Sequence, residues 1–274
     1  MNILFLGDIV GRSGRDALAK RLPRLREDLK LDFVIVNAEN ATAGVGLNVD
    51  HARSILELGV DCITLGDHAF DQREMITYIQ QEPRIIRPIN FAKTAPGNGS
   101  GIFTSPKGKK LLVVQVLGQV FMKKNFSDPF SALDSVLTAS TLGKTHDGSL
   151  VDVHAEATSE KMALGHWCDG RVSLVIGTHT HIPTSDLHRL NKGTIYQTDA
   201  GMCGDYNGII GMDSHEPMQR FITGMSRGRF IPANGEATLC GVFVRVGSFG
   251  FAESAYPVRI GGTLEQIIPR QPDT

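Results

Sequence analysis

The sequence of 274 residues lacks an excess of positive charge and lacks any long apolar run. Its 28 Lys and Arg residues are balanced by 29 Asp and Glu residues, which argues against the basic surface that proteins use to neutralise nucleic-acid phosphates. No apolar stretch approaches the roughly 20 residues that a helix needs to cross a bilayer, and no basic leader precedes the first apolar run. We therefore expect a cytoplasmic protein that is neither exported nor inserted in a membrane.

Cysteine pairs are also missing, because the four cysteines stand far apart and form no CxxC motif. This spacing argues against a structural zinc site and against a small disulfide-linked scaffold. Cys203 has no identifiable base beside it that would activate a nucleophile. We expect reduced, mostly buried thiols at the four positions, which are Cys62, Cys168, Cys203 and Cys240.

Short apolar runs alternate with amphipathic runs, which predicts an α/β fold with a parallel sheet covered by helices. The runs typical of strands are residues 2–7, 33–37, 62–66, 101–104, 110–117, 150–154 and 172–176. The runs typical of helices are residues 16–29, 52–58, 74–80, 129–140 and 159–167. In the tail, β-type runs at 194–198, 239–246 and 251–260 with no helix after about residue 226 predict an antiparallel closing section. Without internal repeats or linkers, a single domain over residues 1–274 is expected.

Five of the expected strands end beside acidic, amide or imidazole side chains. Because ligand sites in open α/β sheets gather at the carboxyl ends of strands, we expect these side chains to converge. Oxygen and imidazole ligands in this mixture suit iron, manganese or zinc better than calcium, and no thiolate competes. The pattern predicts a site for two metal ions, with these candidate ligands: Asp8, Glu39, Asn40, Asp67, His154, His179 and His181.

Taken one at a time, these residues have ordinary alternatives. Asp8, or Ser13 after it, is also suited to cap the following helix. The pair His179 and His181 is either a metal-binding pair or two polar loop residues; if the segment is extended, both rings point to one side. Asp71 lies three residues after His68, at a distance along the chain that allows it to orient the ring.

At the level of motifs, the sequence resembles the YmdB-type branch of the calcineurin-like metallophosphoesterases. The resemblance extends over nearly the whole chain and is carried by the segments GDIVGRSGR, NAENATAGVG, GDH, DVHAEATSEK, GTHTHIPT and TDAGMCGDY. It implies a four-layer α/β/β/α metallophosphoesterase sandwich and the hydrolysis of phosphodiesters, including 2′,3′-cyclic nucleotides.

The resemblance also implies a role for each candidate residue. Glu39 bridges the two metals, and His68 acts as the catalytic acid without binding metal. One metal is held by Asp8, Asn40 and His181, and the other by Asp67, His154 and His179. The chain departs from the family pattern at Asp67, where the family has asparagine, and at Gly204–Asn207, where the family has GPYD.

The expected function is therefore a dinuclear metal-dependent phosphodiesterase acting on 2′,3′-cyclic nucleotides or related small phosphodiesters. The expected cofactors are two divalent or mixed-valence transition metal ions, iron or manganese, with zinc as an alternative. The alternatives are a phosphomonoesterase or RNase with the same site, or a regulatory protein whose metal site is weakened at Asp67. RNA remains an alternative substrate despite the absence of a basic surface, and the sequence leaves open whether the chain forms a homo-oligomer.

Overall fold

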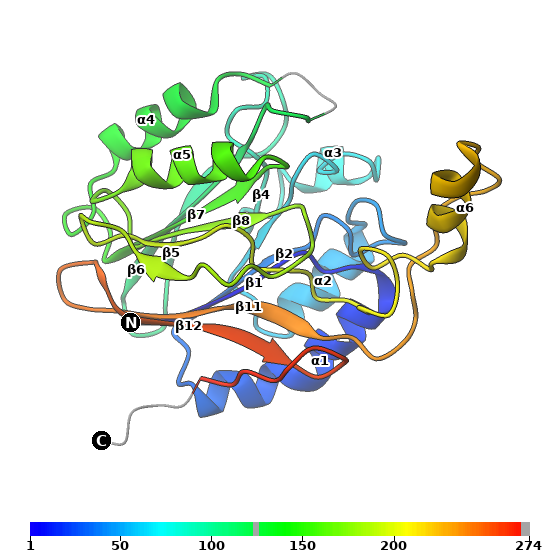
Figure 1. Cartoon of the computed structure of the whole chain (residues 1–274). Coiled ribbons are helices and arrows are strands. Elements are labelled where there is room, and N and C mark those ends of the chain that lie inside the picture. The colour runs from blue at the N-terminus through cyan, green and yellow to red at the C-terminus, as the bar shows by residue number, and fades with distance from the viewer. Residues whose placement is uncertain (123–125, 270–274) are drawn as a thin grey trace.

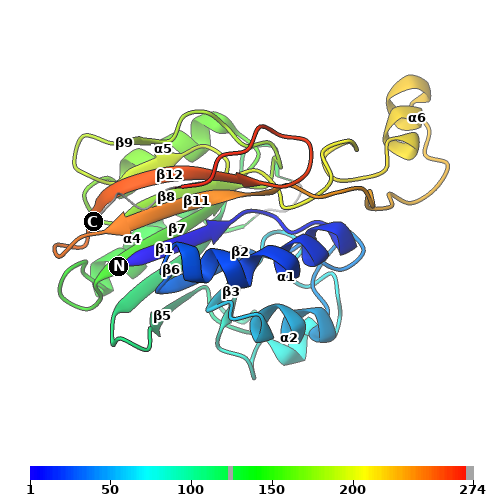
Figure 2. The ribbon, with the colours of Figure 1, turned by 90° about the horizontal axis from the view of Figure 1, so that it is seen from below.

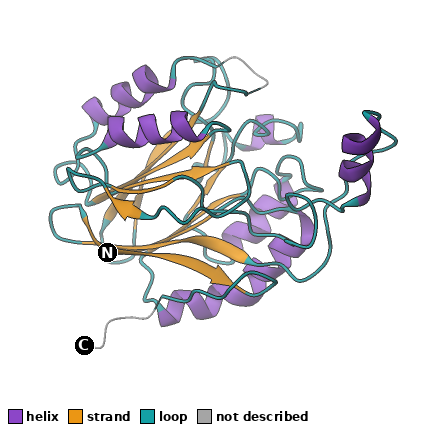
Figure 3. Ribbon diagram, in the orientation of Figure 1, coloured by secondary structure: helices purple, strands orange, loops and turns teal. Residues whose placement is uncertain are grey.

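Two six-stranded sheets lie face to face at the centre of the molecule, and helices cover their outer faces (Figure 1, Figure 3). The computed structural model describes residues 1–122 and 126–269. The strand order is β12-β11-β1-β2-β3-β4 in the first sheet and β5-β6-β7-β8-β10-β9 in the second. The expected four-layer α/β/β/α sandwich is confirmed.

The first sheet joins a parallel half to an antiparallel half. Its parallel strands are β1 (Asn2–Leu6), β2 (Phe33–Asn37), β3 (Cys62–Thr64) and β4 (Ile85–Ile86). Strand β11 (Leu239–Val246) runs antiparallel to both β1 and β12 (Ala252–Ile260), as predicted for these two runs of the tail. Strand β1 is consequently paired on both edges and almost fully buried. The prediction is wrong for the third run, residues 194–198, which joins the second sheet and pairs there in parallel with the strand Leu174–Thr178.

The second sheet is parallel in its middle and antiparallel at its two edges. Its parallel strands are β6 (Lys110–Leu117), β7 (Gly148–His154), β8 (Leu174–Thr178) and β10 (Ile195–Gln197). The edge strands β5 (Ser100–Thr104) and β9 (His188–Arg189) pair antiparallel with β6 and β10.

Successive side chains of a strand point to opposite faces, and this alternation divides the core into layers. From β1, Leu4 packs with Leu18 of α1 (Gly11–Asp28) and Ile55 of α2 (Val49–Glu57), whereas Phe5 packs with Ile176 between the two sheets. The outer face of the second sheet packs against α4 (Pro129–Ala139) and α5 (Thr158–Cys168). Figure 2 shows α1 and α2 side by side on one outer face.

The structure adds elements that the sequence patterns did not indicate. These are the two-residue strands β4 and β9 and the helix α6 (His215–Thr223). Helix α6 projects from the body of the protein and buries only Pro217 (Figure 1). The short helix α3 (Met75–Tyr78) lies within the predicted range. All four cysteines are buried free thiols, as expected, and none of the helices in the described ranges combines the length and apolarity of a membrane span.

Candidate metal centre

The candidate ligands lie at the carboxyl ends of parallel strands in both sheets. Asp8 follows β1, Glu39 and Asn40 follow β2, Asp67 follows β3, and His154 is the last residue of β7. The two remaining candidates, His179 and His181, follow β8. Because the carboxyl ends of these strands meet at one edge of the sandwich, the fold brings together all seven side chains.

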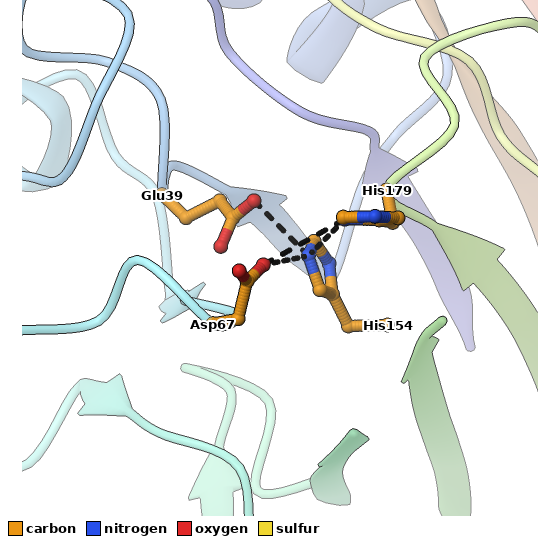
Figure 4. A group of neighbouring side chains, drawn as sticks. All are labelled: Glu39, Asp67, His154 and His179. Carbon is orange, nitrogen blue, oxygen red and sulfur yellow. Dashed lines mark hydrogen bonds and ion pairs between the residues drawn. The ribbon is translucent and has the colours of Figure 1, made fainter. Parts of the chain in front are cut away.

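Four of these side chains form a compact cluster (Figure 4). One ligand atom from each of Glu39, Asp67, His154 and His179 lies within 4.8 Å of the corresponding atoms of the others. The His154 Nε2 atom lies 3.0 Å from Glu39 Oε1 and 3.3 Å from Asp67 Oδ1. The His179 Nδ1 atom lies 3.1 Å from His154 Nε2. Two carboxylates and two imidazoles at these distances form a donor set suited to a transition metal ion.

The other three candidates lie next to this cluster, and Asp8 Oδ1 is about equally far from His154 Nδ1, at 3.9 Å, and from His181 Nε2. The His181 Nε2 atom lies 3.2 Å from Asn40 Nδ2 and 4.0 Å from Asp8 Oδ1. The Asn40 amide also donates to Glu39 Oε1 over 3.2 Å, so Glu39 contacts both groups. Asp8 Oδ1 is buried with no hydrogen-bond partner among the residues described. A buried carboxylate oxygen in this situation is costly unless a cation or a proton lies against it.

His154 and His181 each have one ring nitrogen occupied by the surrounding protein. The Thr178 hydroxyl donates to Asp152 Oδ1 over 2.7 Å, so it accepts from His154 Nδ1 at 2.8 Å. His181 Nδ1 donates to the carbonyl of Ile210 over 2.8 Å. The Nε2 atom of His154 is left to face Glu39 and Asp67, and that of His181 is left to face Asn40 and Asp8. This division of the two nitrogens is the usual arrangement of a metal-binding histidine.

His179 is held in the opposite sense. Its Nε2 atom lies 3.2 Å from Glu156 Oε2, and its Nδ1 atom faces His154 and Asp67. Each of the three site histidines therefore directs one nitrogen into the cluster while the other contacts an oxygen of the protein.

The segment Gly177–His181 is not extended, so the condition under which both rings would point to one side is not met. The backbone φ angle is +97° at His179 and +69° at His181. Both values lie in a region that non-glycine residues rarely adopt, and such strain persists only where the surroundings enforce it. Here Asp199 Oδ2 accepts hydrogen bonds from the Thr180 amide and hydroxyl, at 3.2 and 2.7 Å. The bent backbone sends His179 toward His154, and His181 toward the other group.

The helix-capping alternative for Asp8 and Ser13 is also wrong. Helix α1 has Val10 at its N-cap, with no side-chain hydrogen bond. The Ser13 hydroxyl donates to the Ala233 carbonyl instead. The Asp8 side chain points toward the loop after β8, where its Oδ2 atom accepts a hydrogen bond from the His179 amide over 3.3 Å.

His68 lies at the edge of the cluster, next to Asp71 as predicted. Its Nδ1 atom is 2.6 Å from Asp71 Oδ2, and its backbone amide donates to Glu39 Oε2 over 3.1 Å. About one third of each of these two side chains is exposed, 33% for His68 and 34% for Asp71. His68 lines an open cavity of about 430 Å³ whose walls are Asp67, His68, Phe121, Met122, Glu156 and His179. A histidine in this place can exchange protons with a molecule that occupies the cavity.

Burial and mutual charge set the protonation of the cluster. Burial raises the pKa of Asp8 to about 6. Burial opposes charge on His154, yet Glu39 and Asp67 raise the pKa of this ring well above its ordinary value. Burial also opposes ionisation of Glu39 and Asp67, but His154 holds the pKa of both carboxyls below their ordinary values. Burial and then His154 lower the pKa of His179 to about 4, so this ring is neutral and available to a metal at neutral pH.

Several residues that support the site were not predicted. Lys161, Asp199, Asp152 and Glu156 contact the site residues or the segments that carry them. Asp199 could have been predicted from the sequence, because it follows the end of β10 by two residues, as Asp8 follows the end of β1. No comparable signal marks Lys161, since a lysine in an amphipathic helix is expected to face solvent.

Two other features shape the site. A Cβ atom at Gly66 would lie 2.6 Å from His154 Nε2 and closer still to the Glu39 carboxylate. The segment Gly204–Asn207 lies beside His181, because the Tyr206 hydroxyl donates a hydrogen bond to the His181 carbonyl over 3.0 Å.

Comparison with known proteins shows which family this chain resembles over most of its length. The model of the YmdB-like protein family matches residues 4–257. A 2′,3′-cyclic-nucleotide 2′-phosphodiesterase of Bacillus subtilis (strain 168) is 42% identical over 246 residues, which are 90% of this chain and 91% of that protein. A crystal structure of a hypothetical protein from Thermus thermophilus matches with 41% identity and a TM-score of 0.89, covering 96% of this chain and 100% of the other. A crystal structure described as a novel phosphatase from Mycoplasma pneumoniae matches with 34% identity and a TM-score of 0.86, covering 95% and 93% of the two chains.

Proposed function

This chain belongs to the YmdB-like protein family, and we propose that it is a dinuclear metal-dependent phosphodiesterase that hydrolyses 2′,3′-cyclic nucleotides or related small phosphodiesters. The observation that carries the proposal is the orientation of the three site histidines, each with one nitrogen anchored by the protein and the other facing carboxylates. The activity of the Bacillus subtilis relative supports the choice of substrate.

Two metal ions fit the donor set better than one because the ligands form two groups that meet at Glu39. Asp67, His154 and His179 would hold one ion, with Glu39 shared between the two. The second ion would be held by Asp8, Asn40 and His181. Iron or manganese suits these oxygen and nitrogen donors, with zinc as the alternative. When bound, such a pair of ions supplies Lewis acidity and lowers the pKa of water to near neutrality.

His68 is the residue that we assign to proton transfer. Opening of a 2′,3′-cyclic phosphate breaks one bond between phosphorus and a ribose oxygen, and that oxygen must acquire a proton as water adds to phosphorus. Asp71, at 2.6 Å from Nδ1, orients the ring so that its Nε2 atom is left to face the cavity. The Nε2 atom of His68 would then donate the proton to the departing oxygen, and the product is a nucleoside monophosphate.

The test of this assignment is the dependence of the His68→Ala defect on the leaving group. For a 2′,3′-cyclic nucleotide, whose leaving group is a poor alkoxide, we expect kcat to fall by about 10²–10⁴-fold, the usual contribution of a general acid. For a p-nitrophenyl diester, the leaving group is p-nitrophenolate, which departs without being protonated. The fall in kcat should therefore be much smaller for this substrate. His166→Ala, which changes an exposed histidine of α5, is the control. Equal losses for the two substrates would show that His68 is not the acid.

Metal content and a substrate panel test the broader proposal. The purified protein is expected to contain close to two transition metal ions per chain, and manganese or iron should restore activity after chelation. Parallel assays with 2′,3′-cyclic nucleotides, simple monoesters and short RNA distinguish the phosphodiesterase from a phosphomonoesterase or an RNase. A protein that binds no transition metal and stays inactive with added manganese or iron would favour a regulatory role.

A further inference from the structure

Phe121 is a large aromatic side chain that stands in solvent beside the metal centre. It is 84% exposed, and it lines the cavity that also contains His68, Glu156 and His179. Its backbone φ angle is +64°, which is strained for a residue with a bulky side chain. Exposure of a phenyl ring and strain of its backbone both oppose folding, so a contribution to stability does not account for this position.

The turn that carries Phe121 is held in place by the protein and not by the phenyl ring. The Glu160 carboxylate, which is largely buried, accepts hydrogen bonds from the amides of Gln119 and Val120 at 2.8 and 3.1 Å. The amide of Gly118 donates to the carbonyl of His154 over 3.0 Å, which ties the turn to a residue of the metal centre. The backbone that leads into Phe121 is therefore held beside the cluster by hydrogen bonds.

The ring also has no aromatic partner within the described part of the chain. The phenylalanines near it in sequence are paired, Phe126 with Phe91 and Phe130 with Trp167. Phe121 belongs to none of the ring pairs formed by the described residues. One face of the ring is consequently available to a flat ligand in the cavity.

We propose that Phe121 is the surface on which the base of a nucleotide substrate stacks while the phosphate lies at the metal centre. The assignment rests on the proposed function, because it requires a phosphate at the cluster. Stacking on an aromatic side chain tolerates all bases, since every base has a π face. The site should therefore accept purine and pyrimidine nucleotides alike and should select them over cyclic phosphates that lack a base.

The experiment compares adenosine 2′,3′-cyclic phosphate with glycerol 1,2-cyclic phosphate, which presents a similar five-membered phosphodiester without a base. In Phe121→Ala, KM for the nucleotide is expected to rise about 5- to 150-fold, the range given by stacking measurements, with kcat little changed. KM for the glycerol compound should not change, and Phe121→Trp should retain nucleotide binding. Phe249→Ala is the matched control, because Phe249 is also 84% exposed but lies in the turn between β11 and β12, at the opposite end of the sheet.

Equal effects of Phe121→Ala on the two substrates, or no effect on either, would overturn the assignment. If the wild-type protein hydrolyses neither compound, the proposed function fails, and calorimetric titration of the manganese-supplemented protein with adenosine 3′-monophosphate tests the ring separately. Weaker nucleotide binding by Phe121→Ala than by wild type would still support stacking. Equal affinity of the two proteins would reject it.

Discussion

The ammonium group of Lys161 lies 2.7 Å from the carboxylate of Asp199, and both side chains are completely buried. Asp199 in turn accepts from the amide and hydroxyl of Thr180 and from the amide of Gly201. This ion pair thus connects α5 to the strained backbone between the two site histidines that follow β8. Its energetic role follows from burial, because removal of one partner leaves the other charge uncompensated.

Lys161→Met is therefore expected to destabilise the protein by about 3–5 kcal/mol, the usual cost of breaking a buried ion pair. Chemical denaturation of the metal-free protein measures the change. The control is Arg24→Met, which removes the exposed Arg24–Asp28 pair and should cost at most about 1 kcal/mol. Similar losses of unfolding free energy in the two variants would show that the buried pair stabilises the protein no more than the exposed pair does.

Gly66→Ala should impair the metal centre because the new Cβ would contact the Glu39 carboxylate and the His154 ring. Displacement of metal ligands by about 1 Å should lower kcat/KM about 100-fold, and metal content should fall with it. Elemental analysis and steady-state kinetics measure the two effects. Gly228→Ala is the control, since a Cβ at Gly228 would meet only an ordinary contact. Full metal retention by Gly66→Ala would argue against the assigned positions of these ligands.

Asp67→Asn introduces the asparagine that the family resemblance implies at this position. The change removes one negative charge from the cluster, so an anionic substrate should bind more tightly and metal preference should shift. A fall in KM of about tenfold corresponds to about 1.4 kcal/mol of electrostatic free energy. The readouts are competitive metal loading and steady-state kinetics, with the surface change Asp134→Asn as the control. Unchanged kinetics together with unchanged metal content would count against Asp67 as a ligand.

The raised pKa of Asp8, at about 6, predicts that metal loading weakens as the pH falls through 6, since the proton competes with the metal. In the metal-free protein, folding stability depends on pH in the opposite direction to metal loading. A carboxyl whose folded-state pKa is raised contributes stability below its unfolded value, and this contribution is lost as the pH rises through the folded value. The loss due to Asp8 should be about 3 kcal/mol between pH 4 and 6.

Two measurements check this pH dependence. Metal content after dialysis at pH 5 to 8 reports on loading, and urea unfolding of the metal-free protein over the range 4 to 7 reports on folding. Asp8→Asn, which has no proton to exchange at that position, should flatten the step in folding stability near pH 6. A step of unchanged size in this variant would assign the titration to another group.

Local pattern in the sequence was sufficient to predict most of the fold and to predict which polar side chains at strand ends lie close together. The alternation of apolar and amphipathic runs predicted the strands that carry the site, and polar residues at strand ends predicted Asp8, Glu39 and His154 as neighbours. These predictions succeed because strand direction places the carboxyl ends of parallel strands at one edge, whatever the details of packing.

The directions of the side chains depended on long-range contacts that no local pattern encodes. The different orientations of His179 and His181 follow from their positive φ angles. Asp199, which follows β10, holds this backbone through its hydrogen bond with Thr180, and Lys161 of α5 pairs with Asp199. The exposure of Phe121 depends on the hydrogen bonds that Glu160 makes to the preceding turn. Residues distant in sequence supply these constraints, so tertiary structure alone decided how the candidate site is arranged and which side chains line its cavity.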